Sequence, residues 1–217
     1  PLEQLLTIRE RLIPLLQQQQ DHYRKQLRKQ LLDHNVQLLD YSQLNEQQQQ
    51  WVSDTFRHSV FPVLTPLAVD PAHPFPFVSN LSLNVAAVIH DPESGQRQFA
   101  RVKVPQKNLP RFVSIPTELS ESDPKPIHTA VPLEQVIAFN LDLLFPGMSV
   151  QGHYFFRVTR DADLELRDLE ADDLMLALEQ GLRKRRMGGE VVRLEVPNDM
   201  PEDVVEMLMN GLAVEEE

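Results

Sequence analysis

The sequence of 217 residues contains no cysteine, only seven glycines and no long apolar run. Without cysteine the chain has no disulfide framework, no thiolate nucleophile and no thiolate metal site. Glycine-rich phosphate loops and zinc-ligand spacings do not occur in it. No segment is apolar over the length of a membrane span, and no signal-peptide pattern is present. These absences make a cytoplasmic protein the expected class.

The charge balance is acidic, with 21 lysine and arginine residues against 32 acidic residues and a formal net charge of −11. The average field of such a chain repels polyanions such as nucleic acid. We therefore expect no nucleic-acid partner, although a local basic patch is compatible with this total. The length allows one large domain or two small ones, each with a real core.

The segment from Phe61 to Leu83 combines apolar residues with five prolines. Each proline fixes its own φ, removes a backbone donor and pushes the preceding residue toward extended geometry. Neither a continuous helix nor a central strand fits this spacing. Because the segment has little backbone freedom to lose, it is cheap to order. We expect an ordered crossing that packs on a core and leads into a half-buried strand over Leu81–Ile89.

Residues 1–33 are predicted to be a helical arm, because residues 2–33 have the apolar periodicity of one long helix. Pro14 is expected either to bend this helix or to begin a second one. The apolar stripe packs either on its own domain or on a neighbouring one, and it consists of Leu5, Leu12, Leu16, Tyr23, Leu27 and Leu31. The chain begins without methionine and ends in three glutamates, so we expect a piece of a longer protein.

The remaining residues, 34–217, alternate strand patterns with amphipathic helices. Strands are predicted over Asn35–Leu39, Leu81–Ile89, Ala100–Val104, Arg111–Ile115, Ile127–Val131, Val150–Thr159 and Val191–Val196. Helices are predicted over Gln43–Val60, Pro132–Phe145, Glu170–Met187 and Pro201–Leu212. The pattern predicts an α+β fold with a mixed, mainly antiparallel sheet, helices packed mostly on one face and a long N-terminal helix.

Two local details of these elements can be tested. The helix over Gln43–Val60 is expected to begin at a cap formed by Asn45 or Ser42. Its inner face is expected to contain Leu44, Trp51, Val52, Thr55, Phe56 and Ser59. A turn at Asp91–Gly95 is expected to close an antiparallel hairpin.

One dense basic run closes the predicted helix over 170–187, where cations complement the helix dipole. It consists of Arg183, Lys184, Arg185 and Arg186. Its plain interpretation is the charged end of an exposed helix. Phosphate contact and subunit contact are the two alternatives.

A polar cluster follows the predicted strand over 150–159 and consists of Thr159, Arg160, Asp161 and Asp163. It forms a turn bonded by side chains, an interdomain salt bridge or part of a Mg²⁺ site, and the last needs further ligands. Arg157 and Arg160 are candidates for phosphate or interface contact, and Arg111 is ambiguous in the same way.

Three stretches of the sequence resemble bacterial polyphosphate kinases of the long family with histidine phospho-intermediates. The stretch LTPLAVDPAHPFPFVSNLSLN, at 64–84, is similar to the signature near the start of the head, or middle, domain. The stretches FARVKVPQKNLPRFVSIP, at 99–116, and YFFRVTRDADLEL, at 154–166, resemble the same domain in order and spacing. The resemblance extends from about Asn35 to Leu212.

The resemblance implies an enzyme that transfers the terminal phosphate of ATP reversibly to polyphosphate with the help of Mg²⁺. It implies a helical N-terminal domain before this head and two phospholipase-D-like catalytic domains after it. It also implies a homo-oligomer held by head and N-terminal contacts, in the cytoplasm, with a peripheral membrane location left open. The head is then a non-catalytic domain that supports dimerisation and domain arrangement. The alternatives are a nucleotide- or polyphosphate-contacting module and a regulatory interaction domain of another protein.

The chemistry of the resembled family requires a reactive histidine among arginines and Mg²⁺. The histidines of this chain are His22, His34, His58, His73, His90, His128 and His153. None lies in a stretch that matches the catalytic histidine motifs of the family. We therefore expect no catalytic residue, cofactor or metal ligand in this chain, and a structural hydrogen bond for His73.

Overall fold

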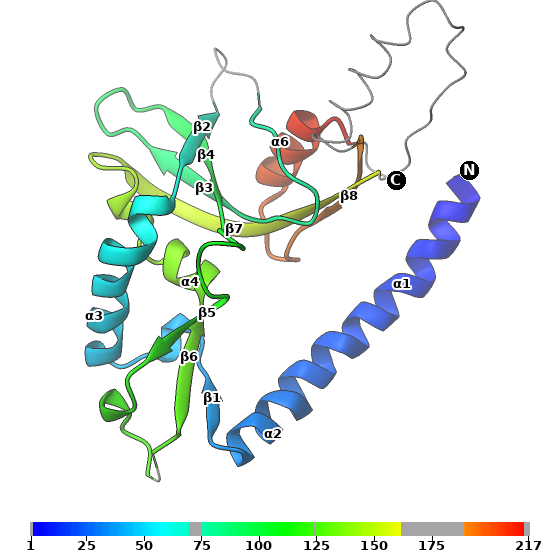
Figure 1. The fold of residues 1–217 in the computed structure, drawn as a ribbon. Coiled ribbons are helices and arrows are strands. Elements are labelled where there is room, and N and C mark those ends of the chain that lie inside the picture. The colour runs from blue at the N-terminus through cyan, green and yellow to red at the C-terminus, as the bar shows by residue number, and fades with distance from the viewer. Residues whose placement is uncertain (1, 70–74, 124, 162–188, 215–217) are drawn as a thin grey trace, which may run out of the picture. The chain divides into compact units, whose positions relative to one another are not determined.

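The computed structural model describes residues 2–69, 75–123, 125–161 and 189–214, which form two compact units (Figure 1). Among the described residues, the first unit contains those within 2–63 and 105–140, and the second contains those within 64–104 and 141–214. The predicted α+β class is confirmed, with two sheets in place of one. Among the described helices, none is long and apolar enough to cross a membrane.

The N-terminal arm is helical from end to end, as predicted. It consists of α1 (Leu2–His22), a π-helical turn (Tyr23–Leu27) and α2 (Arg28–Asp33). Pro14 lies inside α1, which excludes one of the two expected alternatives, a second helix that begins there. Asn35 ends the arm with a φ of 60°, a left-handed conformation that asparagine tolerates better than most residues. The chain therefore leaves the helix directly into a strand.

The first unit is built on a small mixed sheet. Its order is β1 (Val36–Leu38), β6 (His128–Pro132) and β5 (Phe112–Ile115), with β1 parallel and β5 antiparallel to β6. The helices α3 (Glu46–Thr55) and α4 (Leu133–Ala138) both pack against β5. Buried and more exposed residues alternate along β5 and β6, which shows that one face of these strands is buried.

The structure confirms the predicted cap of α3 at Asn45 and corrects the set of residues predicted for its inner face. Asn45 accepts a hydrogen bond from the Gln48 backbone, and the Gln48 side chain bonds back to Asn45 in a capping box. A π-helical turn, Phe56–Val60, continues the helix. Ser59 is exposed, whereas Val60 and Gln48 are buried. The π turn changes the helical phase, which the regular period could not anticipate.

The second unit contains a five-stranded antiparallel sheet. Its order is β2 (Pro66–Val69), β4 (Arg97–Lys103), β3 (Leu83–His90), β7 (Ser149–Arg160) and β8 (Val191–Glu195). The predicted hairpin is confirmed as β3 and β4. The prediction of a half-buried β3 is wrong, because the strand is buried on both faces as a central strand.

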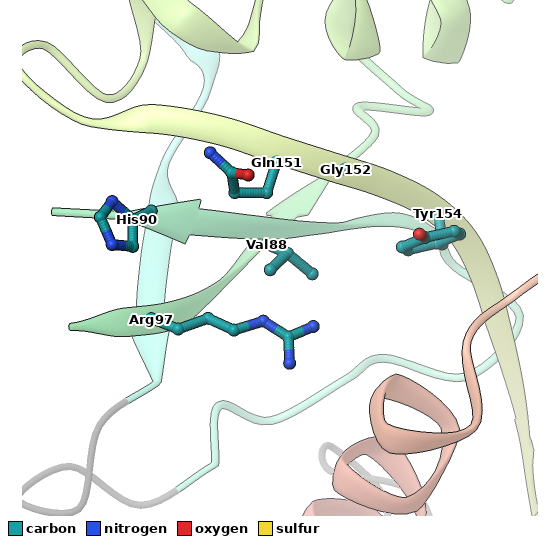
Figure 2. Close-up of a pocket in the computed structure, with 6 residues that line it drawn as sticks. All are labelled: Val88, His90, Arg97, Gln151, Gly152 and Tyr154. Atoms are coloured by element: carbon teal, nitrogen blue, oxygen red, sulfur yellow. The ribbon is translucent and has the colours of Figure 1, made fainter. Parts of the chain in front are cut away.

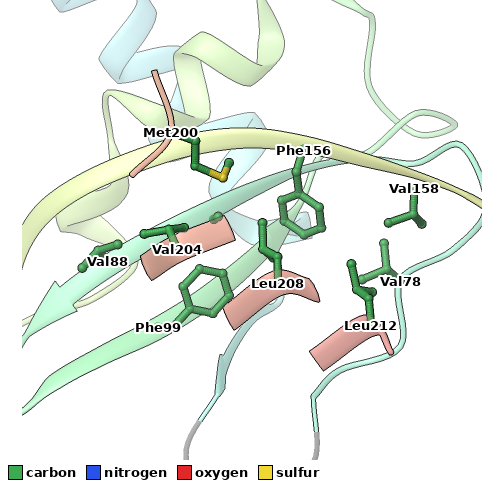
Figure 3. Close-up of a cluster of buried hydrophobic side chains, with 10 residues drawn as sticks. Val78, Val88, Phe99, Phe156, Val158, Met200, Val204, Leu208 and Leu212 are labelled. Carbon is green, nitrogen blue, oxygen red and sulfur yellow. The ribbon is translucent and has the colours of Figure 1, made fainter. Parts of the chain in front are cut away.

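The helix α6 (Glu202–Leu212) confirms the predicted last helix and covers one face of this sheet. Figure 3 shows its side chains Val204, Leu208 and Leu212 directed at the sheet. They pack on Phe99, which projects from β4, and on Phe156 and Val158, which project from β7. The contact places apolar side chains of the helix, spaced by four residues, against the alternating inward residues of the strands.

The proline-rich segment differs from its prediction in two ways. Part of it forms the strand β2, which stands at the edge of the sheet, where Pro66 is tolerated. Several of its apolar side chains are partly exposed to solvent. The exposed ones are Phe61, Val63, Leu67 and Phe77. Val78, by contrast, is buried in the cluster under α6.

Two further helix predictions have different outcomes. The helix predicted over Pro132–Phe145 is much shorter, because Phe139 and Asn140 form a turn between α4 and the 3-10 turn Leu141–Leu143. The helix predicted over Glu170–Met187 lies outside the described residues, and so do His73 and Asp163.

Gly211 of α6 provides a test of this packing. A β-carbon at this position would overlap the ring of Phe75, which also stacks on Phe99. We expect Gly211→Ala to destabilise the second unit by about 1–2 kcal/mol, because overpacking outweighs the gain in helix propensity. Asn210→Ala, on the exposed side of the same helix, is the control and should stay within about 0.5 kcal/mol. Urea unfolding followed by circular dichroism measures both, and equal midpoints would contradict the expectation.

Candidate functional site

The first phosphate-contact candidate, Arg157, lies on β7 in an ion pair. Its Nη2 donates to Glu195 on β8 at 2.6 Å, and Arg193 lies 3.5 Å from the same carboxylate. The guanidinium is therefore partly neutralised by a neighbour on its own sheet. About half of its side chain remains exposed, so the pair is a surface contact of small energetic weight.

The second candidate, Arg160, bonds to the protein backbone. Its Nε donates to the carbonyl of Val78 at 2.7 Å, and its Nη1 donates to the carbonyl of Gly189 at 2.9 Å. The guanidinium also lies over the ring of Phe77, 4.4 Å from the ring centre. Burial lowers the pKa of Arg160. The residue joins three chain segments, and its partners are structural.

The segments beside Arg160 are also paired through their main chains. The amide of Asp161 donates to Glu190, and the amide of Gly189 donates to Asp161, at 2.8 and 3.0 Å. This pairing places Asp161 beside Gly189 and Glu190. The backbone of Asp161 therefore has structural partners. Asp163, the other aspartate of the predicted Mg²⁺ site, lies outside the described residues.

A buried arginine, which the sequence did not single out, holds the same part of the chain as Arg160. We call residues 77–82 the Phe77–Ser82 turn. Arg101 on β4 is only 5% exposed. Its Nη1 donates to the carbonyl of Phe77 at 2.8 Å, and its Nε donates to Asn84 at 2.9 Å. Burial lowers the pKa of Arg101. Lys103, on the same strand, donates to Ser79 in the turn at 2.9 Å.

The Phe77–Ser82 turn contains a strained residue. Leu81 has a φ of 56°, a left-handed conformation that costs a residue with a β-carbon roughly 1–2 kcal/mol. The Leu81 amide donates to Val158 on β7 at 2.9 Å, which holds the strained backbone in place. Strain of this kind persists only where the surrounding contacts overdetermine the conformation. The three cations around the turn provide such contacts.

In the first unit, a polar network fixes the base of the arm. We call Arg28, Asp40, Gln43 and Gln135 the arm anchor. Arg28 of α2 donates to Asp40 at 2.9 Å and to Gln43 at 3.3 Å. Gln135 of α4 donates to the other oxygen of Asp40 at 3.0 Å. The anchor therefore ties the arm helix to the end of β1 and to α4.

The arm anchor also controls the charge state of its carboxylate. Burial by itself would raise the pKa of Asp40, but hydrogen bonds from Gln135 and Arg28 and the positive charge of Arg28 lower it. The net pKa lies below the ordinary value of 3.8. An aromatic stack lies beside the anchor, with Tyr41 and Phe139 almost parallel and their ring centres 4.3 Å apart.

A shallow hollow of about 300 Å³ lies on the sheet of the second unit (Figure 2). Figure 2 shows His90, Arg97, Gln151 and Tyr154 at its sides, on strands β3, β4 and β7. Arg97 is paired with Asp203 of α6, so its charge is already balanced. The hollow offers polar groups but no surplus positive charge, and its chemistry does not favour a polyanion.

The other polar candidates have structural surroundings. Arg111 makes a two-pronged ion pair with Glu134 in the first unit. His153 lies on β7 beside Phe155, and burial lowers its pKa. Among the described residues, no three or more histidine or acidic side chains gather as a metal site requires. The basic run Arg183–Arg186 lies outside the described residues.

The arginines of β7 provide a second test. We expect Arg160→Met to destabilise the second unit by about 1–3 kcal/mol, because two carbonyls lose their charged donor. Arg157→Met removes a surface ion pair and should cost about 0–1 kcal/mol. Urea unfolding followed by circular dichroism gives both values. A larger loss for Arg157→Met than for Arg160→Met would contradict the structural assignment.

The arm anchor predicts a pH dependence. Because the folded-state pKa of Asp40 is lowered, its contribution to stability is present above the unfolded value of 3.8 and is lost as pH falls through the folded pKa. Asp40→Asn should remove this part of the acid destabilisation. The fluorescence of the single tryptophan, Trp51 in α3, reports unfolding of the first unit. Stability curves that fall equally steeply with acid in both proteins would refute the prediction.

Comparison with known proteins places this structure in a family. The model of the polyphosphate kinase middle domain matches residues 47–217. The chain is 99% identical, over its whole length, to a polyphosphate kinase of Parasynechococcus marenigrum and spans 30% of that protein. It is 72% identical over 216 residues to a polyphosphate kinase of Prochlorococcus marinus, again spanning 30% of it.

A solved structure shows the same fold. The crystal structure of polyphosphate kinase from Porphyromonas gingivalis aligns with 98% of this chain and 29% of its own, with a TM-score of 0.76 and 22% identity. The long N-terminal helix and the α+β arrangement therefore recur in that protein. With the family match over most of the chain, we conclude that the chain belongs to the polyphosphate kinase middle domain family.

Proposed function

We propose that this chain is a non-catalytic domain that supports dimerisation and domain arrangement in a polyphosphate kinase. The enzyme would transfer the terminal phosphate of ATP to polyphosphate, as the names of the curated relatives suggest. The observation that carries the proposal is the use of Arg157 and Arg160. Both are engaged by groups of the domain itself, a carboxylate and two backbone carbonyls. These arginines serve the fold, which favours a supporting role over phosphate contact.

The arm supports the second half of the proposal. Large apolar side chains are exposed along α1, namely Leu5, Leu6, Ile8, Ile13 and Leu15. They lie on more than one side of the helix, whereas an arm packed only on its own domain would need one stripe. The arm anchor holds the other end at Arg28. An arm fixed at its base and apolar toward its tip is suited to join this domain to another part of the enzyme.

The partners of the full-length enzyme remain part of the proposal. ATP, polyphosphate and Mg²⁺ would bind elsewhere in the polypeptide, as the resemblance to the family implies. The protein would act in the cytoplasm. The alternative, a module of the same enzyme that contacts nucleotide or polyphosphate, would have to use Arg183–Arg186.

The proposal predicts that the 217-residue chain alone makes no polyphosphate. Purified chain with Mg²⁺ and γ-labelled ATP should yield no labelled polymer on a gel, because the phosphate-transferring groups lie outside this domain. The full-length Parasynechococcus marenigrum protein, which contains nearly the same sequence, is the positive control under identical conditions. Labelled polymer from the chain alone would refute a non-catalytic role.

A further inference from the structure

The helix α6 leaves one end of the sheet in the second unit uncovered. The helix begins at Glu202, and its first buried residue, Val204, belongs to the same apolar cluster as Val88 of β3 (Figure 3). His90, two residues further along β3 on the same face, already lines the hollow of about 300 Å³ described above (Figure 2). The hollow therefore lies beside the start of α6, and its volume is at the small end of the range for ligand pockets.

An irregularity of β7 shapes the floor of the hollow. The register between β3 and β7 shifts between Val88 and Ile89, which leaves Gln151 as the extra residue of a β-bulge. Bulges redirect side chains and are frequent beside functional sites. Gly152 follows, and a glycine inside a strand often marks a place where a ligand approaches the backbone closely. A β-carbon at Gly152 would lie 3.1 Å from the hydroxyl of Tyr154, so even a methyl group would intrude on the hollow.

The polar groups around this floor include both donors and acceptors of hydrogen bonds. Arg97 bonds Asp203 through Nη1, and a guanidinium has five N–H donors in all. Gln151 donates from Nε2 to Ser149 at 2.8 Å, which leaves its carbonyl oxygen to accept from a ligand. Tyr154 adds a hydroxyl, which can donate and accept. A ligand that fits this rim must itself carry donors and acceptors.

The charges at the hollow cancel. Arg97 is paired with Asp203, and its hydrogen bond lowers the pKa of that carboxyl, which is therefore ionised at neutral pH. An anionic ligand would meet repulsion from this carboxylate and from a chain of net charge −11. A neutral ligand avoids both. A sugar ring has the required properties, because its hydroxyls donate and accept around an edge while its C–H face is apolar.

We propose that this hollow binds a neutral sugar ring, with Val88 and Gly152 under the ring and with Arg97, Gln151 and Tyr154 bonding its hydroxyls. A flat nucleobase fits less well, because bases bind mainly by stacking on an aromatic face, whereas the floor here is a valine and a glycine. Such a site would be additional to the supporting role proposed above and does not depend on it.

Nuclear magnetic resonance titration of the isotope-labelled 217-residue chain with glucose tests the proposal. A ligand of about a dozen non-hydrogen atoms should bind with a dissociation constant on the order of 1–10 mM. The amide signals of Gln151, Gly152 and Tyr154 should shift together. Equal affinity for maltotriose would identify a single free ring as the ligand, and at least tenfold tighter binding would identify the end of a sugar chain. Signals that do not move at about 100 mM of either sugar would overturn the site.

Variants of the chain test the assignment of the residues. Gly152→Ala should weaken binding at least tenfold, because the β-carbon displaces the Tyr154 hydroxyl. Arg97→Gln should weaken it by about three- to tenfold, because hydrogen-bond donors are lost. The matched control is Arg157→Gln, since Arg157 is also about half exposed and paired with a carboxylate on the same sheet, but does not line the hollow. It should leave the dissociation constant within about twofold.

Three results would contradict the proposal. The first is an unchanged affinity in both Gly152→Ala and Arg97→Gln. The second is a loss in Arg157→Gln as large as that in Arg97→Gln, which would show an effect of surface charge in place of a contact. The third is binding of glucose 6-phosphate at least tenfold tighter than that of glucose, because a site with balanced charge has no preference for an anion.

Discussion

The fold of the second unit depends on the side chains that donate hydrogen bonds to the backbone of its proline-rich segment. After β2 the chain leaves the sheet, and the carbonyls of Phe77 and Val78 have no strand beside them to supply an amide. Buried carbonyls that stay unpaired are costly. Arg101 and Arg160 reach from β4 and β7 and donate to them. A guanidinium is suited to this task, because its planar set of five donors can bond several acceptors at once. The position of the segment, including Val78 under α6, follows from these contacts.

The same contacts engage the donors of Arg160 that a phosphate would need. A phosphate that recruited Arg160 would have to compete with the carbonyls of Val78 and Gly189. If it displaced them, the loss of each buried bond would cost about 1–3 kcal/mol. The formal charge of −11 adds long-range repulsion. Counting cations near a strand end therefore overestimates the capacity for anions, because their donors are already committed within the fold.

Local patterns in the sequence predicted the elements well and their partners poorly. The sequence correctly predicted the alternation of apolar residues along β3, β4 and β7 and the cap at Asn45, because both features depend only on neighbouring residues. The edge position of β2, the division into two sheets and the burial of both faces of β3 depend on distant pairing, which no short window contains. The sequence did not predict the left-handed conformation of Leu81. Asparagine adopts this conformation more readily than leucine, and the neighbouring Asn80 would have been the expected position for it. Arg160 was a candidate for phosphate or interface contact, and its observed partners, the carbonyls of Val78 and Gly189, are set by tertiary structure that no short window contains.

The two junctions of the domain respond to different conditions, and the difference follows from their chemistry. The arm anchor contains a carboxylate in a half-exposed ion pair, so acid protonates it and salt screens it. The Phe77–Ser82 turn is held by cationic donors bonded to neutral backbone carbonyls and one hydroxyl, so these contacts contain no carboxylate that acid could protonate. The turn therefore keeps its shape over conditions that loosen the base of the arm. The chain therefore contains one set of tertiary contacts that acid weakens and another whose neutral acceptors acid leaves unchanged.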